Sequence, residues 1–213
     1  MTADVSRGAR AADLSHLEAL LAQQDEPQLT PDEYKSVFRG HPAGVAVIAL
    51  EHEGRPVGFT ATSVISVSAA PPLLAFSLAS TSSSWPAVSA ARTVTVSFLA
   101  DHQHDVSARF ATSGIDRFAD GGWSRLASGE PVVDGALSWV RGRIVQRTPV
   151  GDSYLVSLRA LTASTLTRPG EDGTRRDGAS ERGARRDGTA ARTPSPLIYH
   201  DRTYHRIGRH SAL

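Results

Sequence analysis

One stretch decides the fold: Gly58-Phe59-Thr60-Ala61-Thr62-Ser63-Val64-Ile65-Ser66-Val67-Ser68, followed directly by Ala69-Ala70-Pro71-Pro72-Leu73-Leu74-Ala75-Phe76. Its apolar and β-branched residues predict two strands around a short connection rich in hydroxyl groups. The small side chains would let a ligand approach the backbone, so this surface suits a flat, phosphorylated cofactor. An ordinary antiparallel strand with Thr and Ser on its solvent face fits the pattern too, and that interpretation stays open.

A second loop rich in hydrogen-bond donors follows the next apolar run, with the sequence Ser80-Thr81-Ser82-Ser83-Ser84-Trp85-Pro86. Two such loops on either side of one strand could hold one ligand between them. No GxGxxG follows a predicted strand, so backbone N–H groups in a loop of small residues would have to bind the anionic part. Arg109 could supply a fixed charge there, although a solvated helix arginine fits equally well, and the neighbouring Phe110 is more typical of a core.

Composition excludes several classes of protein. The 213 residues are 40% hydrophobic, enough for the core of one large domain or two small ones. The sequence has no apolar run of about 18 residues, so no membrane span is predicted. No apolar segment or cleavage pattern typical of a secretory signal follows Arg7 and Arg10. Cysteine is absent, which removes disulfides and thiolate sites. We therefore expect a cytoplasmic protein with no membrane association.

The charge distribution argues against nucleic-acid binding. Residues 168–192 contain seven Arg and five Asp or Glu, so this segment alone has a net charge of +2. The rest of the chain is then slightly acidic and has no basic excess to neutralise phosphates.

Short strands outnumber helices along the chain. Thr30, Pro31 and Glu33 predict an N-cap, a first helical residue and a capping box for a helix that ends near Arg39. Further helices are predicted at 12–24, at 85–91 and around 107–110, the last begun by Asp101 or Asp105. Strands are predicted at 45–50, from 56 onward, and at 73–78, 93–99, 135–147, 153–161, 197–199 and 204–207. This order favours a closed or partly closed antiparallel barrel.

The predicted organisation is one barrel domain, residues 30–207, between an N-terminal extension, 1–29, and a short tail, 208–213. The extension is expected to be partly disordered with one short helix. Arg175-Arg176-Asp177-Gly178 recurs as Arg185-Arg186-Asp187-Gly188 within a segment that has almost no apolar residues. Residues 168–194 are therefore predicted to be a disordered, low-complexity insertion, more typical of a tolerated loop than of a partner-binding arm.

Two other chemistries have little support. His102 and His104 would share a face of a strand, but no third metal ligand has suitable spacing, so no metal site is predicted. No GxSxG elbow accompanies the serine-rich loop, which argues against a serine hydrolase.

An ordered set of motifs resembles the short-chain flavin reductases, which supply reduced flavin to two-component monooxygenases. The set covers about residues 33–161 and 196–207 and comprises Phe38-Arg39-Gly40-His41-Pro42-Ala43-Gly44-Val45-Ala46-Val47-Ile48, Pro56 to Ser63, Val67 to Leu73, Ser83-Ser84-Trp85, Val94 to Leu99, Ser107 to Ala111, Asp116-Arg117-Phe118, Trp123, Gly135-Ala136-Leu137, Gly151-Asp152 and Pro196-Leu197-Ile198-Tyr199. The resemblance implies a mostly β protein with flanking helices, an FMN-binding split β-barrel, usually a homodimer.

The resemblance also implies the site residues. The isoalloxazine and ribityl region would contact Gly58, Phe59, Thr60, Ala61, Thr62 and Ser63. The phosphate end would lie against Leu78, Ala79, Ser80, Ser83 and Ser84, with Arg109 and Phe110 closing on it. Nicotinamide contacts would fall near Gly151, Asp152 and Ser153 and near Tyr199 and His200.

Ser153 is a departure, because members of the family commonly have His after Gly-Asp, and that His is associated with placing the nicotinamide.

The expected function is an NAD(P)H-dependent flavin reductase that passes hydride from NADH or NADPH to FMN or FAD and supplies a partner monooxygenase. The chemistry needs no side-chain acid or base, so Ser153 and His200, the two candidate catalytic residues, are the weakest of the predicted site residues. A flavin carrier, sensor or partner subunit without reductase activity, or a split-barrel oxidase, remains the alternative.

Overall fold

The computed structural model describes residues 27–164 and 194–208. The helix predicted at 12–24 and the insertion predicted at 168–194, apart from its last residue, lie outside the described residues. The helices are α2 (Pro31–Arg39), α3 (Trp85–Ala90) and α4 (His104–Ala111). The strands are β1 (Ala43–Gly44), β2 (Ala46–His52), β3 (Arg55–Ala61), β4 (Ile65–Ala69), β5 (Pro72–Ala79), β6 (Thr93–Phe98), β7 (Trp123–Arg125), β8 (Pro131–Val133), β9 (Ser138–Val150), β10 (Ser153–Ala163), β11 (Leu197–His200) and β12 (Thr203–Arg206).

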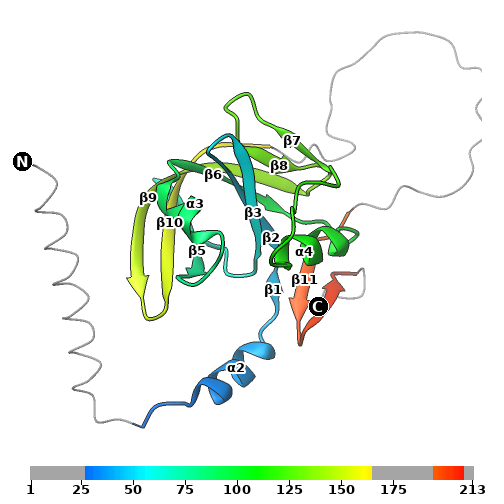
Figure 1. Ribbon diagram of the computed structural model, residues 1–213. Coiled ribbons are helices and arrows are strands. Elements are labelled where there is room, and N and C mark those ends of the chain that lie inside the picture. Colours follow the sequence, from blue (N-terminus) through cyan, green and yellow to red (C-terminus); the bar gives the residue numbers. More distant parts are fainter. Residues whose placement is uncertain (1–26, 165–193, 209–213) are drawn as a thin grey trace, which may run out of the picture.

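Seven antiparallel strands form one sheet in the order β3-β2-β6-β9-β10-β5-β4. The sheet curls, as Figure 1 shows. As a result, aromatic rings on two strands that are far apart in this order meet inside the barrel. Phe59 on β3 and Phe76 on β5 have ring centroids 5.9 Å apart. No hydrogen-bonded ladder joins β3 to β5 in the described sheet, so the barrel is open along this line. The expected mostly β architecture with flanking helices is confirmed.

Two apolar clusters lie on opposite faces of β2. Its apolar run alternates in direction, so that Ile48 and Leu50 enter the barrel while Val47 and Ala49 face outward. The inner cluster also contains Val88 from α3. The outer cluster is completed by residues from α4, the segment after α4, β8, β11 and the position directly after β6: Phe110, Phe118, Val133, Leu197 and Leu99. Burial on both faces explains why β2 reads as a continuous apolar segment.

The stretch that opens the sequence analysis forms three strands instead of the two predicted. β3 lies at one edge of the sheet, and β4 pairs with β5 at the other edge. The connection at 62–64 therefore crosses from one edge to the other. Ser63 ties it to β5, because its hydroxyl accepts from the Ser77 N–H at 3.0 Å and donates to the Ser77 carbonyl at 3.2 Å. Sequence periodicity could not reveal this crossing, since it depends on the curvature of the whole sheet.

Other boundaries differ from prediction for tertiary reasons. Helix α4 begins after Gln103 rather than at Asp101 or Asp105, and the buried Gln103 side chain accepts from the Ala100 N–H and donates to the Asp134 carbonyl. His104 therefore opens a helix instead of sharing a strand face with His102.

The long hairpin of β9 and β10 is tighter than expected. Its loop is reduced to Gly151 and Asp152, with φ of 58° at Gly151, which is the conformation that a two-residue turn with Gly first requires.

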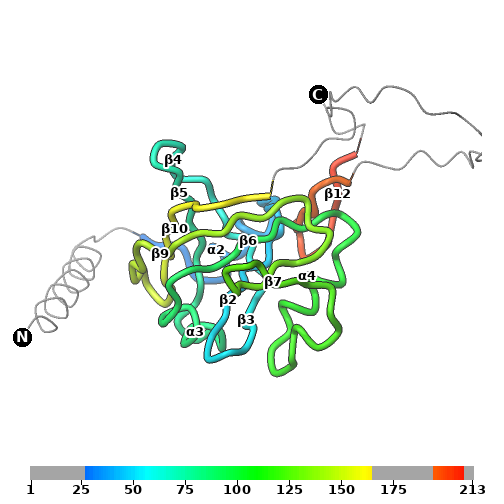
Figure 2. Tube along the Cα trace, turned by 90° about the horizontal axis from the view of Figure 1, so that it is seen from above, coloured from blue at the N-terminus to red at the C-terminus, as the bar shows by residue number. Residues whose placement is uncertain are grey.

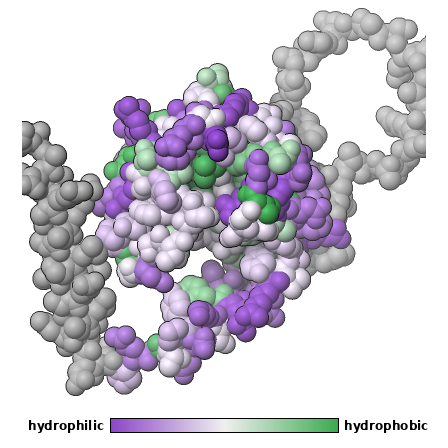
Figure 3. Space-filling view, viewed as in Figure 1, coloured by the Kyte–Doolittle hydropathy of each residue, from purple (hydrophilic) through white to green (hydrophobic). Residues whose placement is uncertain are grey.

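Helix α2 matches its prediction. Thr30 accepts from the Glu33 N–H, and the Glu33 carboxylate accepts from the Thr30 N–H at 2.8 Å, which completes the capping box. None of its residues is buried. In Figures 1 and 3 the helix stands away from the barrel, and Figure 2 shows the barrel from above with β11 and β12 beside its rim. None of the helices in the described part of the chain is long and apolar enough to cross a membrane.

Candidate functional site

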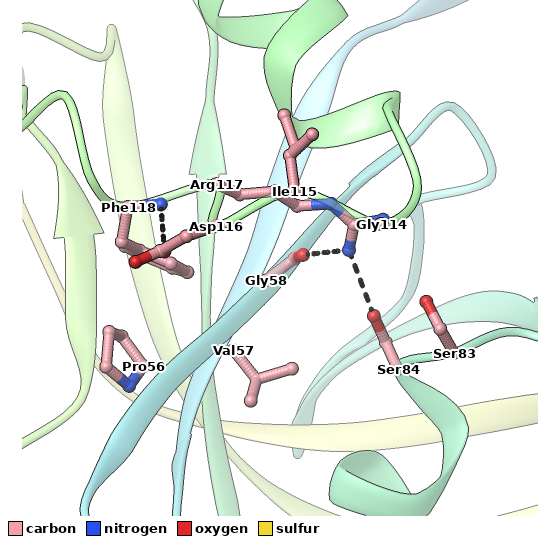
Figure 4. Close-up of a pocket in the computed structure, with 10 residues that line it drawn as sticks. All are labelled: Pro56, Val57, Gly58, Ser83, Ser84, Gly114, Ile115, Asp116, Arg117 and Phe118. Atoms are coloured by element: carbon pink, nitrogen blue, oxygen red, sulfur yellow. Dashed lines mark hydrogen bonds between the residues drawn. The ribbon is translucent and has the colours of Figure 1, made fainter.

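A pocket of about 340 Å³ opens on the outer side of the barrel, between β3, the start of α3 and the segment after α4. Figure 4 shows its lining residues: Pro56, Val57, Gly58, Ser83, Ser84, Gly114, Ile115, Asp116, Arg117 and Phe118. Three of them, Gly58, Ser83 and Ser84, are among the predicted flavin contacts. The sequence-based prediction missed the other seven, although Asp116-Arg117-Phe118 is one of the family motifs and was the available signal.

Arg117 is the central side chain of the pocket. Its Nη1 donates to the Gly58 carbonyl at 2.7 Å and to the Ser84 hydroxyl at 3.3 Å, and its Nε donates to the Thr112 carbonyl at 2.8 Å. The guanidinium thus joins β3, the start of α3 and the end of α4, as the dashed lines in Figure 4 show in part. Burial lowers the pKa of Arg117, yet an arginine remains charged at any physiological pH.

Packing by itself accounts for glycine at position 58, whereas the sequence suggested access for a ligand, which stays a prediction. A Cβ on this residue would lie 2.9 Å from Cε1 of Phe110 and 3.0 Å from both the Ile48 carbonyl oxygen and Cζ of Phe118. The two rings pack edge to face with centroids 4.9 Å apart. The space beside Gly58 is therefore filled by protein, and its carbonyl, rather than its missing side chain, faces the pocket.

Two predicted groups of site residues meet at the hairpin turn. Ser80 donates both its N–H, at 2.9 Å, and its hydroxyl, at 2.7 Å, to the Asp152 carbonyl. Ser153 pairs with Ala79 in the ladder of β10 and β5, and its hydroxyl donates to its neighbour Asp152 at 2.8 Å. The strands flanking this turn thus bring together the residues predicted for the flavin phosphate and those predicted for the nicotinamide. Nearby, Trp85 stacks on Tyr154 with ring centroids 3.8 Å apart.

The predicted contacts on β3 differ in what they offer a ligand. Phe59 and Ala61 are buried in the inner cluster. The Thr60 hydroxyl donates to the Ser107 carbonyl at 2.7 Å, and the Ser63 hydroxyl is committed to Ser77. Only Thr62 is exposed, and it has no hydrogen-bond partner among the described residues. Most of the hydroxyl groups on this stretch therefore serve the fold.

Arg109 lies outside the pocket lining. Its Nη1 pairs with the Asp120 carboxylate at 3.4 Å, and its Nη2 donates to the Gly121 carbonyl at 3.1 Å. Phe110 is 1% exposed, so its ring belongs to the outer cluster and could touch a ligand only if the core opened. The predicted closing of this pair on a flavin phosphate remains a prediction for which the contacts of the two side chains give no support.

Tyr199 and His200 lie on β11, beside α4. Tyr199 packs against Tyr204 with centroids 5.3 Å apart, and the Tyr204 hydroxyl is 2.9 Å from the hydroxyl of buried Ser107. The His200 ring meets that of His205 at 5.6 Å. Within the described part of the chain no hydrogen bond, ring contact or strand pairing joins either residue to Gly151, Asp152 or Ser153. The two groups predicted for the nicotinamide therefore come from separate regions of one chain.

The most perturbed carboxyl group is structural. Glu130 is 4% exposed and receives Arg141 at 2.8 Å and the Ser128 hydroxyl at 2.5 Å, with Thr93 as a further donor. Burial alone would raise its pKa, but the hydrogen bonds from Arg141, Ser128 and Thr93 outweigh burial and lower the pKa to about 2. Among residues 27–164 and 194–208, no three His, Asp or Glu side chains are grouped so that they could hold a metal ion.

Comparison with known proteins identifies the family. The model of the flavin reductase like domain matches residues 38–208, most of the chain. The NADH:FMN oxidoreductase of Rhodococcus qingshengii is 41% identical over 175 residues, which cover 82% of this chain and 80% of that protein. The reductase subunit HsaB of a flavin-dependent monooxygenase of Mycobacterium tuberculosis is 33% identical over 144 residues, 67% of this chain and 77% of its own.

The fold agrees with this identification. A homologue of nitrilotriacetate monooxygenase component B from Mycobacterium thermoresistibile superposes with a TM-score of 0.70 at 27% identity, covering 84% of this chain and 88% of that one. The chain belongs to the flavin reductase like family, and it has the expected split-barrel fold.

Proposed function

We propose that the protein is an NAD(P)H-dependent flavin reductase that supplies reduced FMN or FAD to a partner monooxygenase. The observation that supports it most is the double hydrogen bond from Ser80 to the Asp152 carbonyl. It holds the predicted flavin residues on β5 beside the predicted nicotinamide residues on the hairpin turn, in a chain 41% identical to a relative named NADH:FMN oxidoreductase. The relative named HsaB, a reductase subunit, supports the monooxygenase partner.

The residues present suit a phosphorylated, planar cofactor. Thr62 and Ser83 are exposed and have no partner among the described residues, so their hydroxyl groups are free to bind a ligand. A bound flavin supplies the hydride-accepting chemistry, with the nicotinamide as donor. The chain's own contribution is to orient the two ligands: Ser80 and Asp152 fix the junction, and Trp85 stacks on Tyr154, the residue after Ser153. No side chain has to carry a proton in this scheme.

Ser153 is the residue on which nicotinamide use depends most. Its hydroxyl already donates to Asp152, so it offers the ligand an acceptor rather than a donor. Changing it to His, the residue common in the family, should lower the KM for NADH about fivefold, equivalent to one hydrogen bond of about 1 kcal/mol. Ser66→Ala, on the exposed strand β4, is the matched control and should leave KM unchanged.

The decisive test is anaerobic stopped-flow absorbance at the oxidised-flavin band after the protein and FMN or FAD are mixed with NADH or NADPH. We expect at least one pairing to bleach the flavin much faster than a protein-free control. If no pairing does so while flavin still binds, the protein is a flavin carrier or partner subunit, and the reductase proposal fails.

We also propose that two copies associate. Helix α2 exposes Tyr34, Val37 and Phe38, and β4 exposes Ile65 and Val67, each more than half accessible in the single chain. Apolar side chains presented in this number usually pack against another chain. Light scattering on the purified protein should give twice the chain mass, and a monomer at micromolar concentration would exclude the dimer.

The protein would work in the cytoplasm, where reduced nicotinamide nucleotides are regenerated.

A further inference from the structure

A chain of hydroxyl groups links β3 to the hairpin of β11 and β12 through helix α4. The Thr60 hydroxyl on β3 donates to the Ser107 carbonyl at 2.7 Å, and the Ser107 hydroxyl is 2.9 Å from the Tyr204 hydroxyl on β12. Tyr204 also meets α4 through its ring, whose centroid is 6.4 Å from that of His104. In Figure 1, α4 lies between β3 and β11. Three elements that are far apart in the sequence therefore meet at one turn of α4.

Stability alone does not explain a serine at position 107. The residue lies inside a helix, where serine is a weaker helix former than alanine, and it is fully buried. A pair of hydrogen-bonded hydroxyl groups in such a place adds little net stability, because apolar groups of the same shape would stabilise the fold about equally. What the pair adds is direction, since a hydrogen bond sets both a distance and an angle.

The hairpin depends on such a bond because its other attachments are small. β11 pairs with the two residues of β1, and β12 pairs only with β11 in the described sheets. Arg202 at the hairpin tip has a φ of 61°, in the left-handed region that favours glycine in such a turn. The bond from Tyr204 to α4 therefore bears directly on where the hairpin lies.

The hairpin carries two of the residues predicted for the nicotinamide. Tyr199 pairs with Tyr204 across the two strands, and their ring centroids are 5.3 Å apart, so a shift of Tyr204 also moves Tyr199. His200 is the next residue on the same strand. At the other end of the chain of hydroxyl groups, Thr60 is among the residues predicted to contact the flavin. The network thus joins a predicted flavin contact to predicted nicotinamide contacts.

We infer that Tyr204, through its hydrogen bond to Ser107, is a positioning residue for hydride transfer. The bond sets the distance of Tyr199 and His200 from β3, and so the placing of the nicotinamide against the flavin. Neither hydroxyl has to touch a ligand or move a proton. The inference rests on the proposed function, because it concerns the geometry of that reaction, whose rate is sensitive to a displacement of about 1 Å between the reacting groups.

Three variants test the inference, first without any ligand. Tyr204→Phe and Ser107→Ala each leave one hydroxyl without its partner, so each should unfold at a lower urea concentration than the parent. The double variant removes both hydroxyl groups and should recover. Amide hydrogen exchange at residues 197–206 should be about fivefold faster than in the parent in all three, the equivalent of one ordinary hydrogen bond. Global stability and hairpin order thus separate in the double variant.

Flavin reduction is then measured by anaerobic stopped flow, with protein-bound flavin mixed with saturating NADH or NADPH, whichever the parent uses faster. We expect a bleaching rate about tenfold lower in all three variants, with flavin affinity within about twofold of the parent. A purely structural role predicts that the rate recovers together with stability in the double variant. Ser89→Ala is the matched control, because its exposed hydroxyl on α3 donates to the Pro86 carbonyl, and its loss should change neither rate nor exchange.

Two results would overturn the inference: a double variant with the parent's rate or the parent's exchange at 197–206, or a rate that falls in Tyr204→Phe but not in Ser107→Ala. If the single variants fail to fold, the double variant alone decides, since its stability should be close to that of the parent. Failure of the proposed function is recognised separately, because the parent itself would then not bleach flavin, and the inference would fall with it.

Discussion

Helices α2 and α4 are of similar length but are stabilised in opposite ways. Helix α2 has a complete capping box, proline at its first position and acidic residues in its first turn, yet it buries no residue. Helix α4 has no side-chain cap at its N-terminus, but it buries Ser107 and Phe110 against the barrel. Local signals define the first helix and tertiary packing the second, so sequence changes should affect the two regions differently.

The largest effect is expected where α4 packs on β3. Gly58→Ala would place a methyl group within 3.0 Å of the Phe110 and Phe118 rings and of the Ile48 carbonyl. The Ile48 carbonyl belongs to the backbone and both rings are buried, so none of the three groups can move aside easily, and we expect a loss of about 3 kcal/mol in the free energy of unfolding. Urea denaturation monitored by circular dichroism measures it. Gly44→Ala is the matched control, because its Cβ would meet nothing within 4 Å; equal stabilities would show that packing here is loose.

A smaller effect is expected in the body of the barrel at Glu130. Glu130→Gln keeps an oxygen that can accept from Arg141 but removes the negative charge, and it should cost about 2 kcal/mol. The folded pKa of Glu130, about 2, lies below its ordinary value of 4.5, so the ionised carboxylate stabilises the fold above pH 4.5. That contribution is lost as pH falls from about 4.5 to about 2. Unfolding measured between pH 7 and pH 2.5 should therefore show the variant and the parent converging, and parallel curves would contradict the assignment.

The smallest effect is expected at the cap of α2. Thr30→Ala removes the side chain that accepts from Glu33 and should fray the helix, since such a cap stabilises a helix by about 1 kcal/mol. Because no residue of α2 is buried, global unfolding of the single chain should change by less than about 0.3 kcal/mol. Amide hydrogen exchange at residues 31–39 measures the fraying. A loss of stability that depends on protein concentration would instead indicate that α2 packs on a second copy.

The same contrast explains which features the sequence could predict. Thr30, Pro31 and Glu33 act within one helical turn, so the start of α2 was predictable to the residue. The start of α4 was not, because Gln103 is held by Ala100 and by Asp134, which is far away in the sequence. The β-rich barrel followed from strand periodicity, but the crossing from β3 to β4 depends on how the sheet curls.

The candidate site was predictable in part for related reasons. Motif resemblance brought Gly58, Ser83 and Ser84 into one site, and they do line one pocket. It named Arg109 and not Arg117, although both lie in family motifs, and only the folded structure shows that Arg117 lines this pocket. The role of Gly58 was also hidden, since a small residue that admits a ligand and one that admits a phenylalanine ring look the same in a sequence.

The double hydrogen bond from Ser80 to Asp152 has a thermodynamic consequence. It links the loop before α3 to the turn between β9 and β10, so the two loops cannot move independently. A ligand that displaces the turn must also shift the loop that carries Ser83, and one that fixes the loop must restrict the turn. If the binding of one ligand changes the affinity for the other by some factor, the second changes the affinity for the first by the same factor. The order in which flavin and nicotinamide arrive then alters the rates of assembly but not the stability of the ternary complex.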